Sequence, residues 1–212
     1  MSLVIEALTV RAADGAALFG PLTLCIAPGE VATVMGPSGA GKSTLLDAIG
    51  GHLAPGFSLS GRVLLSGREV TRLPAEARRI GLMFQDGLLF PHLSVADNLA
   101  FGLSPRIRGR AARRAAVDEA LALAGLRGLG GRDPATLSGG QRARAALMRT
   151  LLARPEALLL DEPFSGLDAA LRAEMRRFVF DHVRARAIPA LLVTHDPEDA
   201  AAAGGPVVTL AG

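Results

Sequence analysis

The chain has no tryptophan, no tyrosine, one cysteine and one lysine among its 212 residues. A single cysteine, Cys25, excludes an internal disulfide and favours a reducing compartment. No apolar run approaches the roughly 18 residues that a helix needs to cross a bilayer. Residues 1–6 place no basic stretch before their apolar residues, so no signal peptide is expected. We therefore expect a cytosolic protein whose membrane association depends on a partner.

Charge and hydrophobicity bound the class of protein further. Half of the residues are apolar, and this length suits one globular α/β domain. The net charge of +3 and the sequence pI near 10.3 raise the possibility of nucleic-acid binding. The densest arginine cluster lies at residues 106–114, followed by Asp118 and Glu119, and lacks the interleaved aromatics of a base-stacking surface. This pattern favours a solvated helix face over a nucleic-acid site.

The only lysine, Lys42, lies in the segment GPSGAGKST at residues 36–44. A compact ammonium fits inside a turn of backbone N–H groups around a phosphate, where the wide arginine fork has little room. The segment also fits the phosphate-binding pattern G-x-x-x-x-G-K-[ST]. The predicted phosphate-binding residues are Gly36, Pro37, Ser38, Gly39, Ala40, Gly41, Lys42, Ser43 and Thr44.

The flanking sequence supports this interpretation. An apolar run at residues 31–35 is typical of a buried strand, and residues 44–49 open a helix that Gly50 and Gly51 end. Strand, glycine loop and helix in this order place free N–H groups and the positive end of a helix dipole at one point. The alternative, a glycine-rich turn with a solvated lysine, does not account for the strand and helix.

The order of predicted elements indicates one domain with an insertion. Residues 3–65 are strand-rich, residues 86–154 are helical, and the last third returns to strands and helices. We predict an α/β phosphate-loop core with a mainly parallel sheet, an N-terminal antiparallel β element and an inserted α-helical subdomain. The core comprises residues 1–85 and 155–212, and the helical subdomain comprises residues 86–154.

Two adjacent acids, Asp161 and Glu162, follow the apolar run at residues 157–160. A buried parallel strand delivers a carboxylate to the edge of the sheet where ligands bind. Asp161 is predicted to hold Mg²⁺ through water while the Ser43 hydroxyl binds it directly. Glu162 is predicted to act as the general base for an attacking water. The alternative is a strand capped by two surface acids, which the phosphate loop in the same chain disfavours.

A second phosphate-binding element is predicted at Ser138, Gly139, Gly140 and Gln141, which open a helix. Its N–H groups and serine hydroxyl form an anion site like that of the first loop. One nucleotide does not easily use two helix N-termini from separate subdomains of one chain. A second copy turned head to tail could supply the second element, which predicts a twofold dimer with nucleotide clamped between the chains.

Two further polar residues complete the predicted site. His195 follows the apolar run at residues 190–193, where it can touch a γ-phosphate or orient the water and Glu162. The Gln85 amide can bind Mg²⁺ or water at the point where the core gives way to the helical insertion. The remaining histidines are interpreted as surface or packing residues.

These segments, in this order, resemble the ATP-binding subunit of an ABC transporter over nearly the whole chain. By this match residues 36–44 are the Walker A loop, Gln85 the Q-loop glutamine and residues 138–141 the signature. The remaining matches are the Walker B aspartate Asp161, the catalytic glutamate Glu162, the D-loop aspartate Asp168 and the switch histidine His195. The resemblance implies an ABC ATPase fold, ATP and Mg²⁺ as cofactors, and a homodimer or a paired second ATPase subunit with transmembrane permease subunits.

The stretch at residues 84–95 is similar to the importer class, in which this region receives a helix of the membrane subunit. Residues 133–137 and the compact length are most similar to thiamine-type and related small-solute importers. The resemblance therefore implies a periplasmic solute-binding protein and a location on the inner face of the membrane through the permease. Residues 11–15 lack the aromatic that usually stacks on adenine, and the C-terminal regulatory domain of the larger sugar importers is not expected.

Two other functions agree less well with the sequence. A non-transport ABC ATPase acting on DNA or ribosomes would carry long coiled coils, zinc insertions or tandem cassettes. The interval between Lys42 and Ser138 has no heptad run and no cysteine cluster. A scaffold with a dead site is disfavoured because all the chemistry-bearing residues are present. The sequence does not identify the transported solute.

Overall fold

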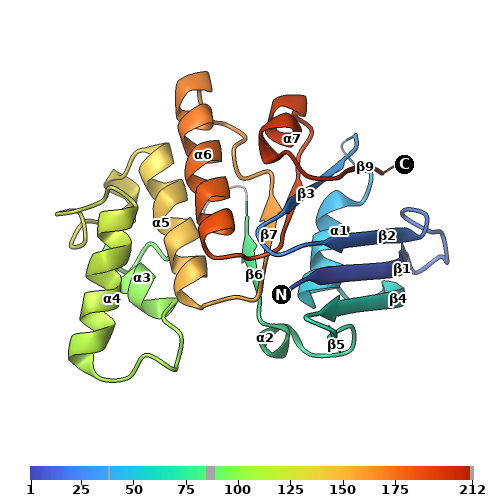
Figure 1. The fold of residues 1–212 in the computed structure, drawn as a ribbon, viewed down its shortest axis with the longest axis horizontal. Helices are drawn as coiled ribbons and strands as arrows, with labels where there is room; N and C mark the ends of the chain where they lie inside the picture. The colour runs from blue at the N-terminus through green and yellow to red at the C-terminus, as the bar shows by residue number, and fades with distance from the viewer. Residues whose placement is uncertain (38, 85–88, 211–212) are drawn as a thin grey trace. The chain divides into compact units, whose positions relative to one another are not determined.

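The computed structural model describes residues 1–37, 39–84 and 89–210, which fall into two compact units. The core unit comprises Met1–Leu82, Glu156–Glu162 and Arg176–Gly212, and the helical unit comprises Met83–Pro155 and Pro163–Met175. Figure 1 labels most of the helices and strands of both units. Within the described residues, no helix is both long enough and apolar enough to cross a membrane.

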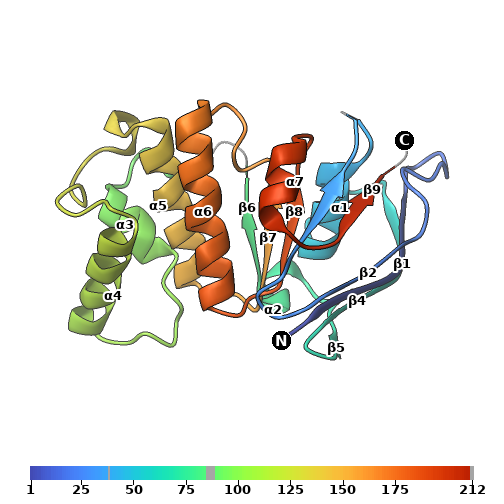
Figure 2. The same cartoon turned by 45° about the horizontal axis from the view of Figure 1, so that its top comes forward.

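A five-stranded sheet forms the centre of the core unit, in the order β6-β7-β8-β3-β9 (Figure 1; β8 is labelled in Figure 2). Its strands are β3 (Val31–Met35), β6 (Ile80–Met83), β7 (Ala157–Asp161), β8 (Ala190–Val193) and β9 (Val207–Thr209). Strand β3 pairs in parallel with β8 and β9, and β8 with β7. Val193 is in register with both Val34 and Asp161. The carboxyl ends of three strands are therefore aligned at one edge.

A four-stranded antiparallel sheet occupies the N-terminal part, in the order β2-β1-β4-β5. Its strands are β1 (Leu3–Arg11), β2 (Leu22–Ile26), β4 (Ser58–Leu65) and β5 (Arg68–Glu69). The pairing of β1 with β4 shifts between Glu6 and Thr9, at Ala7 with φ 47°. Gly61 lies opposite, and a Cβ there would come within 2.5 Å of the Ala7 carbonyl oxygen. The irregularity therefore requires glycine in β4.

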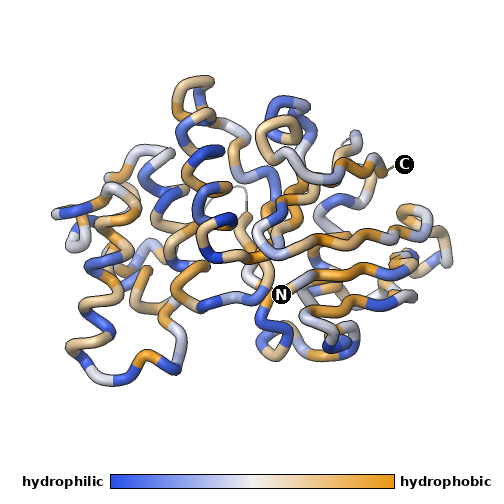
Figure 3. The backbone as a smooth tube through the Cα atoms, viewed as in Figure 1, coloured by the Kyte–Doolittle hydropathy of each residue, from blue (hydrophilic) through white to orange (hydrophobic). Residues whose placement is uncertain are grey.

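Helix α1 (Lys42–Gly50) joins the two sheets into one hydrophobic core. Leu45, Leu46 and Ile49 on α1 are buried among apolar residues of β1 and β4 on one side and of β3 and β7 on the other. Figure 2 shows α1 between the two groups of strands, and Figure 3 shows hydrophobic residues along the strands. The predicted α/β class, with a parallel sheet and an N-terminal antiparallel element, is confirmed.

The core unit also contains α2 (Ala75–Arg78), α7 (Pro197–Ala203) and the C-terminal part of α6 (Ala169–Ala185). Asp196 caps α7 because its Oδ1 accepts a hydrogen bond of 2.8 Å from the Glu198 amide. The N-cap of α7 therefore directly follows His195, so that the cap and the predicted switch histidine share one turn.

The helical unit contains α3 (Val95–Phe101), α4 (Arg110–Leu123), the 3₁₀ turn η1 (Pro134–Thr136), α5 (Gly139–Leu152) and the start of α6. The Ser94 hydroxyl caps α3 by accepting from the Asp97 amide. The fully buried Asn98 side chain hydrogen-bonds to Phe90, Leu93 and Ser94 backbone groups and so fixes the turn before α3. Helix α5 spans the predicted residues 139–152.

Candidate functional site

The phosphate loop connects β3 to α1 in the predicted way. Gly41 has φ 80°, and a Cβ there would come within 3.2 Å of the Phe19 ring. The backbone therefore needs glycine for both its conformation and its close contact. The Lys42 ammonium is buried and donates hydrogen bonds of 2.9 Å to the Gly36 and Pro37 carbonyl oxygens. The lone lysine thus lies inside the loop, and Ser38 lies outside the described residues.

Asp161 ends β7 beside this loop, and its carboxylate has a hydrogen bond with the Ser43 hydroxyl. Burial raises the pKa of Asp161 above its usual value, and the charges of Glu162 and Asp47 raise it further. The Ser43 hydrogen bond and the Lys42 charge oppose this shift. The sequence pattern did not single out Asp47, whose charge acts on Asp161 from the second turn of α1.

The hydroxyl and carboxylate of Ser43 and Asp161 suit Mg²⁺, which takes oxygen ligands. The part of the chain that the structure describes brings no three His, Cys, Asp or Glu side chains together as a metal site. Mg²⁺ in proteins is commonly held by one or two carboxylates together with substrate phosphates. This pair of oxygens therefore fits a cation that arrives with a nucleotide. Gln85, the other predicted metal ligand, lies outside the described residues.

Glu162 and His195 are brought together at the same sheet edge. The Glu162 Oε2 atom lies 3.2 Å from His195 Nδ1. Glu162 adopts φ 43°, a left-handed conformation that is strained for a residue with a Cβ, and its amide donates to the Val193 carbonyl oxygen over 2.9 Å. The Glu162 side chain is 22% exposed and that of His195 is 64% exposed. A carboxylate that lies against an imidazole beside a phosphate loop is a suitable arrangement for general-base chemistry.

The second predicted anion element lies in the helical unit. The Ser138 Oγ accepts a hydrogen bond of 3.3 Å from the Gln141 amide, and Gln141 Oε1 accepts one of 3.0 Å from the Ser138 amide. Ser138 and Gln141 thus form a capping box at the start of α5. Gly140 has a packing role as well, because a Cβ there would come within 2.5 Å of the Leu171 side chain on α6. Sequence reasoning missed this packing role.

Asp168 precedes α6 in the same unit. Its Oδ1 accepts a hydrogen bond of 3.0 Å from the Leu171 amide, and its backbone oxygen accepts one from the Arg172 amide. These bonds satisfy N–H groups of the first turn of α6. Asp168 therefore fixes the start of α6 in addition to its predicted place in nucleotide binding.

The region predicted to contact adenine is a short turn between Arg11 and Ala17. The Arg11 guanidinium donates to the Gly15 carbonyl oxygen over 3.0 Å, and Arg11 and Ala17 form an isolated bridge. Phe19 is only 3% exposed and belongs to the hydrophobic core. Its ring is therefore not available to stack on a base.

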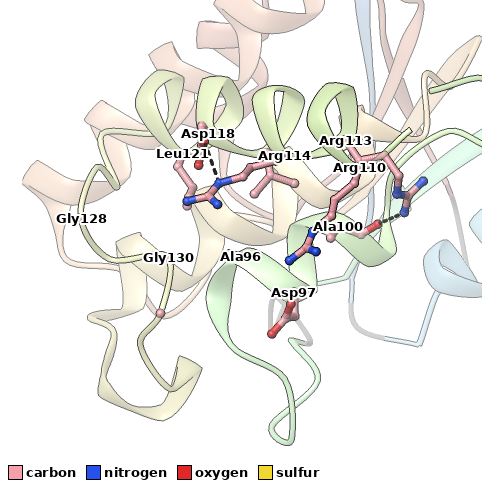
Figure 4. Close-up of a pocket in the computed structure, with 12 residues that line it drawn as sticks. Ala96, Asp97, Ala100, Arg110, Arg113, Arg114, Asp118, Leu121, Gly128 and Gly130 are labelled. Atoms are coloured by element: carbon pink, nitrogen blue, oxygen red, sulfur yellow. Dashed lines mark hydrogen bonds and ion pairs between the residues drawn. The ribbon is translucent and has the colours of Figure 1, made fainter. Parts of the chain in front are cut away.

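A cavity of about 550 Å³ lies within the helical unit between α3, α4 and the glycines at 128, 130 and 131. Figure 4 shows the Arg110 guanidinium directed toward Asp97. Arg113 donates to the Ala100 carbonyl oxygen over 3.1 Å, and Arg114 lies 3.9 Å from Asp118. Two arginines of the cluster at residues 106–114 therefore have partners inside this unit.

The chain is similar to ABC transporter proteins along most of its length. The model of the ABC transporter family matches residues 19–165. An uncharacterised ABC transporter ATP-binding protein of Escherichia coli, YnjD, is 54% identical over 171 residues, which are 81% of this chain and 78% of that protein. The thiamine import ATP-binding protein ThiQ of Cereibacter sphaeroides is 48% identical over 198 residues, 93% of this chain and 83% of that protein.

Larger relatives and a solved structure agree with these matches. The sulfate/thiosulfate import ATP-binding protein CysA of Gloeobacter violaceus is 44% identical over 213 residues, 99% of this chain and 60% of that protein. The structure of cbiO1 from Clostridium perfringens, part of the ABC transporter complex cbiONQ, is 30% identical with a TM-score of 0.86. That match covers 98% of this chain and 84% of the cbiO1 chain.

Proposed function

Because this chain belongs to the ABC transporter family and is one of its ATPases, we propose that it hydrolyses ATP in a head-to-tail dimer that drives import of a small solute. One observation carries the proposal. Lys42, Asp161 and the Glu162–His195 pair lie at the carboxyl edge of one parallel sheet. A phosphate, a metal and an attacking water meet at such an edge in phosphate-loop enzymes.

Binding of the triphosphate is assigned to residues 36–44. Backbone N–H groups of the loop and the first turn of α1 face the phosphates, and the Lys42 ammonium exchanges its two carbonyl partners for phosphate oxygens. Ser43 and Asp161 would hold Mg²⁺, with Gln85 as a further proposed ligand. When bound, the cation neutralises charge on the phosphate oxygens.

Hydrolysis is assigned to Glu162 and His195. The Glu162 carboxylate accepts a proton from the attacking water. Its contact with the His195 imidazole, at 3.2 Å, orients the carboxylate. His195, largely exposed, contacts the γ-phosphate or the same water. Both side chains follow buried strands, so the rigid sheet positions them.

The helical unit is proposed to act on the nucleotide of a second copy. Ser138, Gly139, Gly140 and Gln141 would present the N-terminus of α5 to a γ-phosphate held by the phosphate loop of the partner. Asp168, at the start of α6, would lie at the same interface. In this proposal the core unit binds and hydrolyses ATP, and the helical unit completes the nucleotide site of the partner.

Names of the relatives support import but differ in the solute. They include import proteins for thiamine, for sulfate or thiosulfate and for ferric ions. We propose that this chain serves separate permease subunits from the inner face of the cell membrane, with a periplasmic solute-binding protein supplying a thiamine-like or other small solute. The second ATPase subunit is a copy of this chain or a paired relative.

Replacement of Glu162 by glutamine tests the proposal. Glu162→Gln should lower ATP turnover by about 10²–10⁴-fold, because the amide cannot accept the proton. The variant should still bind ATP, and with turnover blocked the dimer should accumulate in size-exclusion chromatography with light scattering. Glu156→Gln, at the other end of β7, is the matched control and should behave like the unaltered protein. A Glu162→Gln protein that stays monomeric with saturating Mg-ATP would contradict the proposal.

A further inference from the structure

The turn that carries His195 is bound by an ionic cluster centred on Arg176 of α6, in which Arg176 and Asp199 are buried and Glu198 is largely exposed. The Arg176 Nε lies 2.5 Å from Asp199 Oδ1, its Nη1 lies 3.1 Å from Glu198 Oε2, and its Nη2 lies 3.3 Å from Asp196 Oδ2. Arg176 and Asp199 are 9% and 3% exposed. One guanidinium therefore contacts three carboxylates of the segment that follows His195.

Thr194 extends this cluster to the other side of the histidine. Its hydroxyl donates a hydrogen bond of 2.8 Å to Asp199 Oδ2 and accepts one of 3.1 Å from the Asp196 amide. The Thr194 amide also donates to the Val34 carbonyl oxygen in the neighbouring strand β3. His195 thus lies between two residues whose positions are fixed by the same buried carboxylate and guanidinium.

The position of the cluster beside His195 explains its presence better than a contribution to the stability of the fold does. A buried ion pair such as Arg176–Asp199 has a desolvation cost that often equals its electrostatic gain, so stability alone is a weak reason for this pair. The His195 side chain is 64% exposed and projects from this turn toward Glu162. Because a solvent-exposed imidazole has few packing contacts of its own, the geometry of the turn sets where it lies.

We infer that Arg176, Asp199 and Thr194 are positioning residues that hold the His195 imidazole against Glu162 during ATP hydrolysis. The inference rests on the proposed role of His195. The relay runs from the guanidinium through the Asp199 carboxylate to the Thr194 hydroxyl and ends on the Asp196 amide. None of the three residues needs to touch the nucleotide, so loss of the relay should affect turnover more than nucleotide binding.

Thr194→Val and Thr194→Ser form a matched pair for the test. Valine keeps the shape but removes the hydroxyl, and serine keeps the hydroxyl. Thr194→Val should lower kcat about tenfold with the KM for ATP within about twofold, and Thr194→Ser should restore at least about half of the lost turnover. Unchanged kcat in Thr194→Val would overturn the inference.

A double-mutant cycle with His195→Ala separates this inference from the proposed function. If Thr194 acts through His195, adding Thr194→Val to His195→Ala should cause less than about a twofold further loss of kcat. Equal losses of kcat in both backgrounds would overturn the inference while leaving the role of His195 intact. Unchanged kcat in His195→Ala alone would instead contradict the proposed function.

A direct readout of the imidazole distinguishes positioning from general stabilisation. In protein labelled with ¹⁵N-histidine, Thr194→Val should shift or broaden the ring signals of His195 and leave those of His52, His92 and His182 in place. Movement of all four sets, or of none, would overturn the inference. Where Thr194→Val does not fold, Asp199→Asn keeps the volume and weakens the same relay, and the same kcat, KM and ring-signal criteria apply.

Discussion

At the scale of single residues, the Asp161 carboxylate is under opposing influences that determine when it can bind a cation. Burial and the charges of Glu162 and Asp47 raise its pKa, whereas Ser43 and Lys42 lower it. A raised pKa keeps the acid protonated to higher pH. Since a divalent cation requires the anionic form, the affinity of the site for Mg²⁺ should fall as pH falls through this raised pKa.

Asp47→Asn is expected to move this acid limit to lower pH, because it removes one negative charge that raises the Asp161 pKa. The measurement is ATPase activity at half-saturating Mg²⁺ and saturating ATP, between about pH 5 and pH 8. Asp181→Asn changes an exposed acid of α6 and should leave the profile in place. An acid limb that moves to higher pH in Asp47→Asn would contradict this assignment of charges around Asp161.

At the scale of elements, Arg78 holds the C-terminal end of α1, the helix that starts at the phosphate loop. Its guanidinium donates to the Ala48, Ile49, Thr71 and Leu73 carbonyl oxygens over 2.6–2.8 Å. The side chain is 5% exposed, and burial lowers its pKa. A Cβ on Gly51 would come within 2.6 Å of Arg78 Nε, so glycine is needed where the arginine passes.

Arg78→Lys should therefore destabilise the protein although it keeps the positive charge. An ammonium cannot reach four carbonyl oxygens in the geometry of a planar fork, and each lost hydrogen bond to a charged group costs roughly 1.5–3 kcal/mol. We expect the free energy of unfolding in urea to fall by about 2–4 kcal/mol. Arg72→Lys, at an exposed position in the same segment, is the control. If Arg78→Lys lowers the free energy of unfolding no more than Arg72→Lys does, Arg78 does not have this role.

Some elements could be predicted from the residues at their own ends, whereas others could not be predicted from the sequence. The bounds of α5 follow from the cap at Ser138 and the proline that stops the helix, both of which act within a few residues. Strands β5 and β9 have two and three residues, so their pairing partners define them and a short pattern does not.

The same distinction applies to the site. The phosphate loop, Asp161, Glu162 and His195 are marked by glycines and apolar runs beside them, and the structure places all of them at one edge of the sheet. The Arg176 contacts join residues 20 to 23 positions apart, and the Arg78 contacts with Ala48 and Ile49 join residues 30 and 29 positions apart, in a sequence where arginine is common. Nothing in the local pattern separates these two arginines from those on the surface, because tertiary contacts alone define their role.

At the scale of the whole molecule, the two compact units each carry part of the proposed nucleotide site. Lys42, Asp161, Glu162 and His195 belong to the core unit, and Ser138 and Asp168 belong to the helical unit. In a twofold head-to-tail dimer, the core unit of one copy meets the helical unit of the other at each of two equivalent sites. Each complete site would then need residues from both chains.

Mixing two inactive variants tests this arrangement. Lys42→Ala should lose phosphate binding, and Ser138→Arg should block the signature that the substituted chain presents to the nucleotide of its partner. In a mixed dimer, one site combines the Lys42 of one chain with the Ser138 of the other and is intact, while the second site carries both substitutions. Half of the dimers in an equal mixture are mixed, so up to about a quarter of full turnover should return.

Lys42→Ala mixed with Lys42→Ala,Ser138→Arg offers no intact site and should stay inactive. Equal activity in both mixtures would place the two elements in the same chain's site.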